Sequence, residues 1–176
     1  MEQSMQEFWQ EVVLYSFLGM AAYMDGKKGV IPVWLSGSAF GAGLCLAWWD
    51  GGWGIVWYLM RFLLFAAPFF VLGLCGMMGG GDFKLFGIIG ALCGGIHGSR
   101  ILLCTLAFAG AAALTKMCRN GSLQRRMQVF LWYCRRCAAA RVWYRYPVTV
   151  RPEDTLHLGV FALMGAAAAE LLRWWM

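Results

Sequence analysis

Two aspartates stand at the boundaries of long apolar segments, where an ionisable side chain is costly. Asp25 ends the first apolar run and is followed by two lysines, whereas Asp82 comes directly after the glycines 79–81 and opens another run. An ionisable residue at or inside a membrane span is by default a sign of function, because burying it costs free energy. Asp25 and Asp82 are therefore the first candidates for chemistry.

Two carboxylates that approach each other share a proton, because like charges at short range do not both ionise. The ionised partner takes a proton from water, and the protonated partner gives one to a departing group. Water attack on an amide needs both steps. The glycines beside Asp82 also allow backbone and substrate to approach closely. We therefore predict a dyad that activates water, if the fold brings both aspartates to one side of a membrane.

The composition predicts that membrane-spanning helices position these residues. Of the 176 residues, 61% are hydrophobic and 14% are charged, whereas a soluble domain is about half apolar and about a quarter charged. The long apolar runs have room for about six spans of roughly 20 residues, with no separate soluble domain. The prediction is an all-α, polytopic membrane protein with a single domain over 1–176. Its helices are expected at about 8–24, 31–49, 53–78, 83–96, 99–118 and 155–174.

The basic residues predict the orientation of the chain in the membrane. With the N-terminus outside, the cytoplasmic side receives all of the 15 Lys and Arg residues except Arg61, Arg100 and Arg173. The same orientation puts Asp25 and Asp82 together on the cytoplasmic side, although only Lys and Arg were used to assign it. For Arg61, inside the third span, pairing or snorkelling to the interface is expected.

The segment 119–151 combines positive charge with apolar residues at helical spacing, among them Leu123, Met127 and Phe130. We predict a basic cytoplasmic loop that contains an interfacial helix, with anionic membrane lipids as its partner. The net charge of +6 does not indicate nucleic-acid binding, because the basic residues flank apolar runs.

The cysteines and histidines do not predict a metal site. The seven cysteines are scattered, and the single CxxC pair, Cys134 and Cys137, is half of a tetrahedral zinc site. His97 and His157 fall at opposite ends of the bilayer in the predicted topology. Neither a metal nor another cofactor is expected.

The residues around both aspartates form segments of known type. Asp82 lies in Gly79-Gly80-Gly81-Asp82-Phe83-Lys84-Leu85, and Asp25 is followed seven residues later by Pro32 of an Ile-Pro pair. The first segment resembles the GxGD signature, with its trailing Lys-Leu, of the type IV prepilin peptidases. The second is similar to that family's first active-site segment. The order of the segments, their cytoplasmic placement and the six-helix plan also agree.

The resemblance implies an intramembrane aspartic endopeptidase in the cytoplasmic (inner) membrane of a prokaryote. Such enzymes cut the short basic leader from type IV pilin-like precursors on the cytoplasmic side, typically after a Gly. By motif position, Asp25 and Asp82 carry over as the catalytic pair. The residues expected at the substrate are Gly79, Gly80, Gly81 and Lys84.

The chain departs from the larger members of that family in one loop. Those members carry two CxxC pairs between the first two spans and also methylate the new N-terminus, whereas the corresponding loop here is only 26–30. A short form that acts as a peptidase alone, without methyl transfer, is therefore expected.

Other classes of protein remain open. A transporter, or a subunit of a secretion or pilus assembly apparatus, would use the two aspartates as ion or proton sites, and an isolated Asp25 would simply be a solvated helix end. Transporter sites usually lie near the bilayer midplane, whereas these aspartates lie at one edge. The peptidase is the preferred hypothesis.

Overall fold

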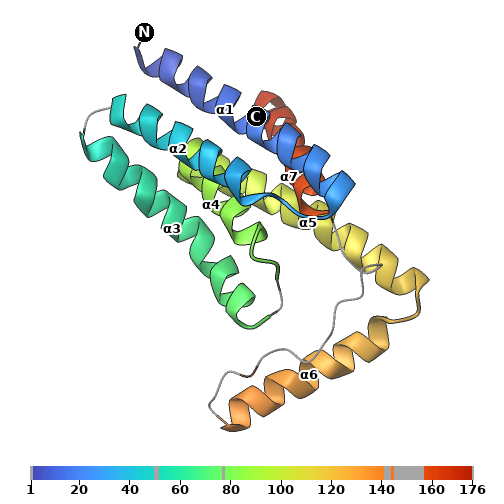
Figure 1. Cartoon of the computed structure of the whole chain (residues 1–176). Helices are drawn as coiled ribbons and strands as arrows, with labels where there is room; N and C mark the ends of the chain where they lie inside the picture. The colour runs from blue at the N-terminus through green and yellow to red at the C-terminus, as the bar shows by residue number, and fades with distance from the viewer. Residues whose placement is uncertain (1, 50–51, 77, 141–143, 145–156, 176) are drawn as a thin grey trace.

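The computed structural model describes residues 2–49, 52–76, 78–140, 144 and 157–175, which contain seven helices and no strand. The helices are α1 (Glu2–Lys28), α2 (Val33–Trp49), α3 (Gly52–Leu74), α4 (Asp82–Cys93), α5 (Gly95–Arg119), α6 (Leu123–Ala140) and α7 (Leu158–Trp175). Figure 1 shows their arrangement. The prediction of an all-α protein is confirmed.

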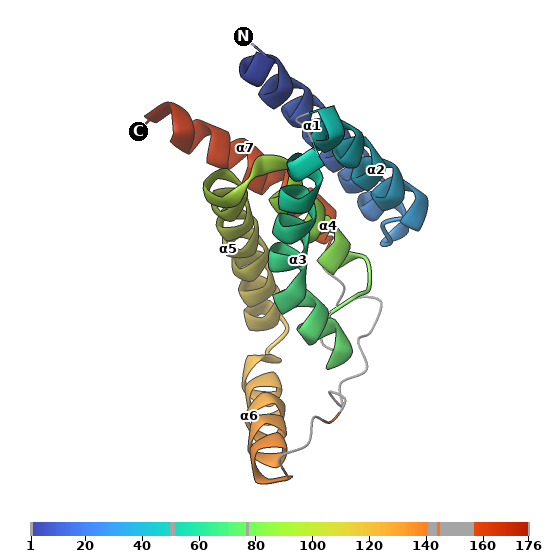
Figure 2. The same ribbon diagram turned by 90° about the vertical axis from the view of Figure 1, so that its left-hand side faces the viewer.

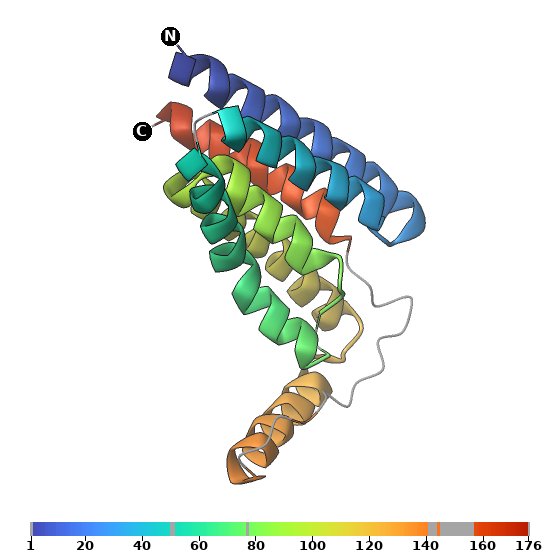
Figure 3. The ribbon, with the colours of Figure 1, turned by 60° about the vertical axis from the view of Figure 1, so that its left-hand side comes forward.

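The short helix α4 lies at the centre of the bundle. Every residue from Leu85 to Leu92 is buried, as expected for a helix that is apolar all round. Helix α4 packs against α3 and α5 and also contacts α1 and α2, while α7 packs against α1 and α5. Figure 3 shows α4 between α3 and α5. This packing fixes the position of Asp82, the first residue of α4.

Glycine allows α3 and α4 to approach closely. A methyl group at Gly87 would lie 2.7 Å from the ring of Phe62, and one at Gly90 would overlap the ring of Phe65. Glycine therefore permits close helix packing at these positions. Close packing is absent at Gly41, where a methyl group would meet nothing within 4 Å.

Several predicted helix ends are wrong. Helix α1 begins at Glu2 rather than at residue 8, and α3 ends at Leu74 rather than at residue 78. Two further ends are explained by glycines with positive φ. Helix α1 continues past residue 24 to Lys28 and stops at Gly29, whose φ is +64° and whose N–H donates to the carbonyl of Asp25. Helix α4 ends at Cys93 and α5 begins at Gly95, because Gly94, with φ +74°, turns the chain in a single residue. Asp25 thus lies inside the last turns of a helix rather than beyond its end.

In the part of the chain that the structure describes, three helical segments are long and apolar enough to cross a membrane: Trp53–Leu74, Gly95–Arg119 and Leu158–Trp175. Helix α2 is apolar but shorter, and the 12 residues of α4 span about 18 Å, which is less than the roughly 30 Å of bilayer hydrocarbon. The apolar helices indicate a membrane protein. The number of six spans and the outside N-terminus stay predictions.

Helix α6 stands apart from the other helices, beyond the end of α5 (Figures 1 and 2). It lies within the basic segment 119–151, where the sequence predicts a helix. Much of the rest of that segment, residues 141–143 and 145–151, lies outside the described residues. Its position at a membrane surface stays a prediction.

Candidate functional site

Asp25 is buried in the bundle and has a specific hydrogen-bond donor. Only 6% of the residue is exposed. Its Oδ2 accepts a hydrogen bond of 2.7 Å from the backbone N–H of Gly159, in the first turn of α7. On the other oxygen, the distance from His157 Nδ1 to Oδ1 is 3.7 Å. Asp25 is therefore held from a segment that is distant in the sequence.

Asp82 opens α4 at the same end of the bundle. Its N–H donates to the carbonyl of Gly79 at 3.2 Å, which forms the turn that leads into the helix. Asp82 lies outside the three segments long enough to span the membrane. Burial, followed by the negative charge of Asp25, raises the pKa of Asp82 to about 6, although a backbone hydrogen bond from Gly79 opposes this rise. The fold thus brings the two aspartates close enough for their charges to interact.

The surroundings of Asp82 favour its protonated form. A carboxyl whose pKa is raised by burial and by a second carboxylate keeps its proton to a higher pH than an isolated one. The other carboxylate, Asp25, accepts an N–H from the start of a helix, where negative charge is stabilised. In such a pair the ionised carboxylate can take a proton from water, and the protonated carboxyl can donate one to a group beside it.

The glycine run before α4 contributes space at one of its three positions. Gly79, Gly80 and Gly81 are not among the described glycines with positive φ, so their backbone conformation does not require glycine. A methyl group at Gly79 would lie 3.2 Å from Asp82 Oδ2, whereas one at Gly80 would meet nothing within 4 Å. At Gly81 it would make an ordinary contact with Ile31. Gly79 is therefore the glycine that leaves room beside the Asp82 carboxylate.

Lys84 lies in the first turn of α4, half-buried, with Nζ 5.8 Å from the centre of the Phe83 ring. It is thus two residues beyond Asp82 and on the same helix.

Gly159 and His157 are contacts of Asp25 that the sequence analysis missed. A backbone N–H has no signature in a sequence, and Gly159 reads as one more small residue of an apolar helix. The one available signal was His157 at the start of the last predicted span, on the same side as Asp25. That signal was used only to argue against a metal site.

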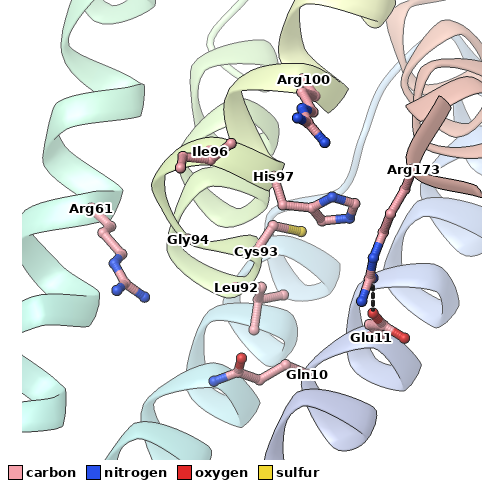
Figure 4. Close-up of a pocket in the computed structure, with 10 residues that line it drawn as sticks. All are labelled: Gln10, Glu11, Arg61, Leu92, Cys93, Gly94, Ile96, His97, Arg100 and Arg173. Carbon is pink, nitrogen blue, oxygen red and sulfur yellow. Dashed lines mark hydrogen bonds and ion pairs between the residues drawn. The ribbon is translucent and has the colours of Figure 1, made fainter. Parts of the chain in front are cut away.

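A second polar region lies at the opposite end of the bundle, where α1 begins and α7 ends. There Arg173 Nη1 is 3.0 Å from Glu11 Oε1 and 3.8 Å from Glu170 Oε1, and His97 Nε2 is 3.0 Å from Glu170 Oε1. Glu11, His97 and Arg173 border a cavity of about 410 Å³, into which Arg61 projects from α3 (Figure 4). Glu11 and Asp25 are about 21 Å apart along α1 at 1.5 Å per residue. This region is therefore separate from the aspartate pair.

The described residues bring no three His, Cys, Asp or Glu side chains together as metal ligands would be. Cys134 and Cys137 lie on α6 as free thiols.

Comparison with known proteins places the chain in a family. The sequence profile of the type IV leader peptidase family matches residues 12–116, which is more than half of the chain. The chain belongs to this family. The resemblance seen around Asp25 and Asp82 is thereby confirmed at the level of the family, and the protein is a peptidase of this membrane-embedded group.

The matched range shows which parts of the leader peptidase are common to the family profile. It contains Asp25, the glycines 79–81, Asp82 and Lys84, and it ends before α6 and α7. The contacts from His157 and Gly159 to Asp25 therefore come from outside it. No match was found among curated proteins or among solved structures.

Proposed function

We propose that this leader peptidase is an intramembrane aspartic endopeptidase that cleaves the leader from type IV pilin-like precursors. Asp25 and Asp82 form its catalytic pair. The observation that carries the proposal is the position of the two carboxylates: Asp25 is buried near the end of α1, which contacts α4, and Asp82 is the first residue of α4. The pKa of Asp82, raised by burial and by the charge of Asp25, agrees with it. Family membership supports the peptidase reaction, and this electrostatic coupling supports the choice of residues.

In the proposed reaction, the ionised Asp25 takes a proton from a water molecule while the water oxygen attacks the carbonyl carbon of the scissile peptide. Protonated Asp82 gives its proton to the carbonyl oxygen, which yields a neutral tetrahedral intermediate. Transfer of the proton from Asp25 to the amide nitrogen then lets the carbon–nitrogen bond break, and Asp82 recovers its proton from the intermediate. Each aspartate ends in its starting state.

The glycine run is proposed as the substrate entrance. Gly79, Gly80 and Gly81 precede Asp82 without side chains, so an extended peptide with a small residue at the cut site reaches the carboxylates. Lys84 is proposed to meet an acidic group of the mature segment. The site is proposed to face the cytoplasm in the inner membrane of a prokaryote, as the distribution of Lys and Arg predicts.

Cleavage of a pilin-like precursor by the purified protein tests this proposal. Asp25→Asn and Asp82→Asn keep the side-chain shape but cannot exchange a proton, so each is expected to lower the cleavage rate by roughly 10²-fold or more. Glu11→Gln, on α1 at the opposite end of the bundle, is the matched control and should cleave at close to the wild-type rate. Normal cleavage by either Asp variant would remove that residue from the catalytic pair.

The alternative of an ion or proton site in a transport or assembly subunit makes a different prediction. It expects no cleavage of any precursor by the wild-type protein. The position of the aspartates at one end of the bundle, rather than half-way along it, favours the peptidase.

A further inference from the structure

The start of α7 holds Asp25 through the backbone of Gly159. The N–H of Gly159 donates to Asp25 Oδ2 at 2.7 Å, and both residues are buried. This N–H belongs to the second residue of α7, and the N–H groups of a first helical turn have no partner inside their own helix. The bond therefore satisfies a donor that would otherwise be buried without an acceptor.

Close contact between the backbones of α1 and α7 makes this bond possible. A methyl group at Gly159 would lie 3.0 Å from the carbonyl oxygen of Ala21 and 3.1 Å from Asp25 Cβ. Further along the same helix, Gly165 sits directly against Thr105 of α5. Small residues thus allow α7 to lie close to both of its neighbours, and they fix the position of its first turn relative to Asp25.

A hydrogen bond from a helix N-terminus to a carboxylate has two effects. It is charge-assisted, so it is stronger than a bond between neutral groups, and it adds the favourable end of the helix dipole. It also occupies Oδ2 of Asp25, whereas Oδ1 faces His157 Nδ1 at 3.7 Å.

We propose that Gly159 is the positioning residue for Asp25: its N–H orients the carboxylate and stabilises the ionised form that takes a proton from water. This inference rests on the proposed function and extends it beyond the residues of the family profile. Gly159 itself does not touch the reacting atoms.

Several charged groups surround Asp25 and bear on any test by pH. Asp82 faces it from α4 and His157 from the residue before α7. On its own helix, Lys27 and Lys28 are exposed, and Lys27 Nζ donates to the hydroxyl of Tyr23. None of these groups is altered when only the N–H of Gly159 is removed.

A backbone ester removes that N–H with minimal change in shape. Glycolic acid incorporated in place of Gly159 in the full-length protein replaces the N–H with an oxygen. The matched control is the hydroxy-acid analogue of Leu158, because the N–H of Leu158 makes no hydrogen bond to another described residue. The glycolic variant is expected to lose about tenfold to hundredfold in kcat with little change in KM. The acidic limb of its pH–rate profile should move to higher pH, and the control should resemble the wild type.

A second measurement needs no substrate. The ester at 159 should lower the melting temperature of the otherwise native protein, and it should do so much less in an Asp25→Ala background, because the two groups are coupled. An unmoved acidic limb, or an equal loss of melting temperature in both backgrounds, overturns the positioning role. If the wild type cleaves no precursor at all, the proposed function fails instead, so the two failures are distinguishable.

Discussion

Asp82 combines a cost in stability with its proposed use in chemistry. A carboxyl that is partly buried near a second carboxylate is easier to keep neutral than charged, so the folded state opposes its ionisation. A residue that serves packing alone does not place an ionisable group where the fold opposes its ionisation. The conflict itself gives the first test of the site at the scale of one residue.

Asp82→Asn is expected to be inactive and yet more stable than the wild type above about pH 6. The pKa of Asp82 rises from 3.8 to about 6 on folding, so the wild type loses stability as the pH rises through this window, and the amide does not. After allowance for partial solvent screening, the gain is about 1–2 kcal/mol. Unfolding in detergent as a function of pH measures it. The two proteins should converge near pH 4, and a variant that is less stable at every pH would contradict the argument.

The same pKa predicts how cleavage depends on pH. If the pair must hold one proton, kcat/KM for the free enzyme should fall about tenfold per unit once the pH exceeds about 6. Initial rates at low precursor concentration, between about pH 5 and about pH 8, measure this limb. A rate that continues to rise across that range would show that Asp82 acts in its ionised form.

Gly79 and Gly80 are neighbours in the sequence and are expected to differ in tolerance. Gly79→Val should reduce cleavage by roughly tenfold or more, because a side chain there crowds the carboxylate of Asp82, 3.2 Å from the first added carbon. Gly80→Val should lose less activity than Gly79→Val, since its first carbon meets no protein atom within 4 Å. Cleavage assays on the two variants, with folding checked by gel filtration, compare them directly. Equal losses would point to a requirement for flexibility in the whole run.

At the scale of the helices, the position of α4 depends on its contact with α3. Gly90→Ala forces a methyl group into the ring of Phe65, and such overpacking typically costs 1–3 kcal/mol. A lower melting temperature is expected, together with reduced cleavage, because α4 carries Asp82. Gly41→Ala, in the open space beside α2, is the control and should leave both unchanged. If Gly90→Ala melts and cleaves like the wild type, α3 and α4 can move apart at little cost, which would contradict this prediction.

The helices themselves were largely predictable, since apolar runs and basic flanks mark them. The ends of the helices were less predictable. The lysines at 27 and 28 read as the start of a loop, but they sit in the last turn of α1, where basic side chains interact favourably with the helix dipole. The break between α4 and α5 depends on the φ angle of the single residue Gly94, and nothing distinguishes it in sequence from the adjacent Gly95.

At the scale of the whole molecule, α6 is the part least integrated with the bundle. Its exposed apolar side chains, among them Phe130, Leu131 and Trp132, accompany exposed arginines such as Arg125 and Arg135. Arg136 stacks near the rings of Trp132 and Tyr144. This combination suits the surface of an anionic membrane.

Neutralising the arginines of α6 is expected to affect activity through the lipid. Replacing Arg125, Arg126, Arg135 and Arg136 by Gln should weaken cleavage in anionic vesicles by at least about tenfold, at about 1 kcal/mol per basic residue near the surface. It should change cleavage little in neutral detergent. The matching Arg→Lys protein keeps the charge and serves as control. Equal loss in both media would instead assign a structural role to the helix.

The candidate site was predictable only where side chains carry the chemistry. Asp25 and Asp82 are charged residues in apolar surroundings and stand out in the sequence. The donor to Asp25 lies 134 residues further along the chain and is a main-chain group, so only the packing of α7 on α1 reveals it.

That separation also sets an order of events during synthesis. A chain emerging from the ribosome presents Asp25 to the membrane early, whereas its buried partner at 159 follows only after the segments for α2 to α6 have been made. Until α7 inserts, the Asp25 carboxylate lacks this donor and stays hydrated or protonated, because an unpaired charge is costly in a bundle. During synthesis, the proposed active site therefore lacks one of its hydrogen bonds while the later helices are still being inserted into the bilayer.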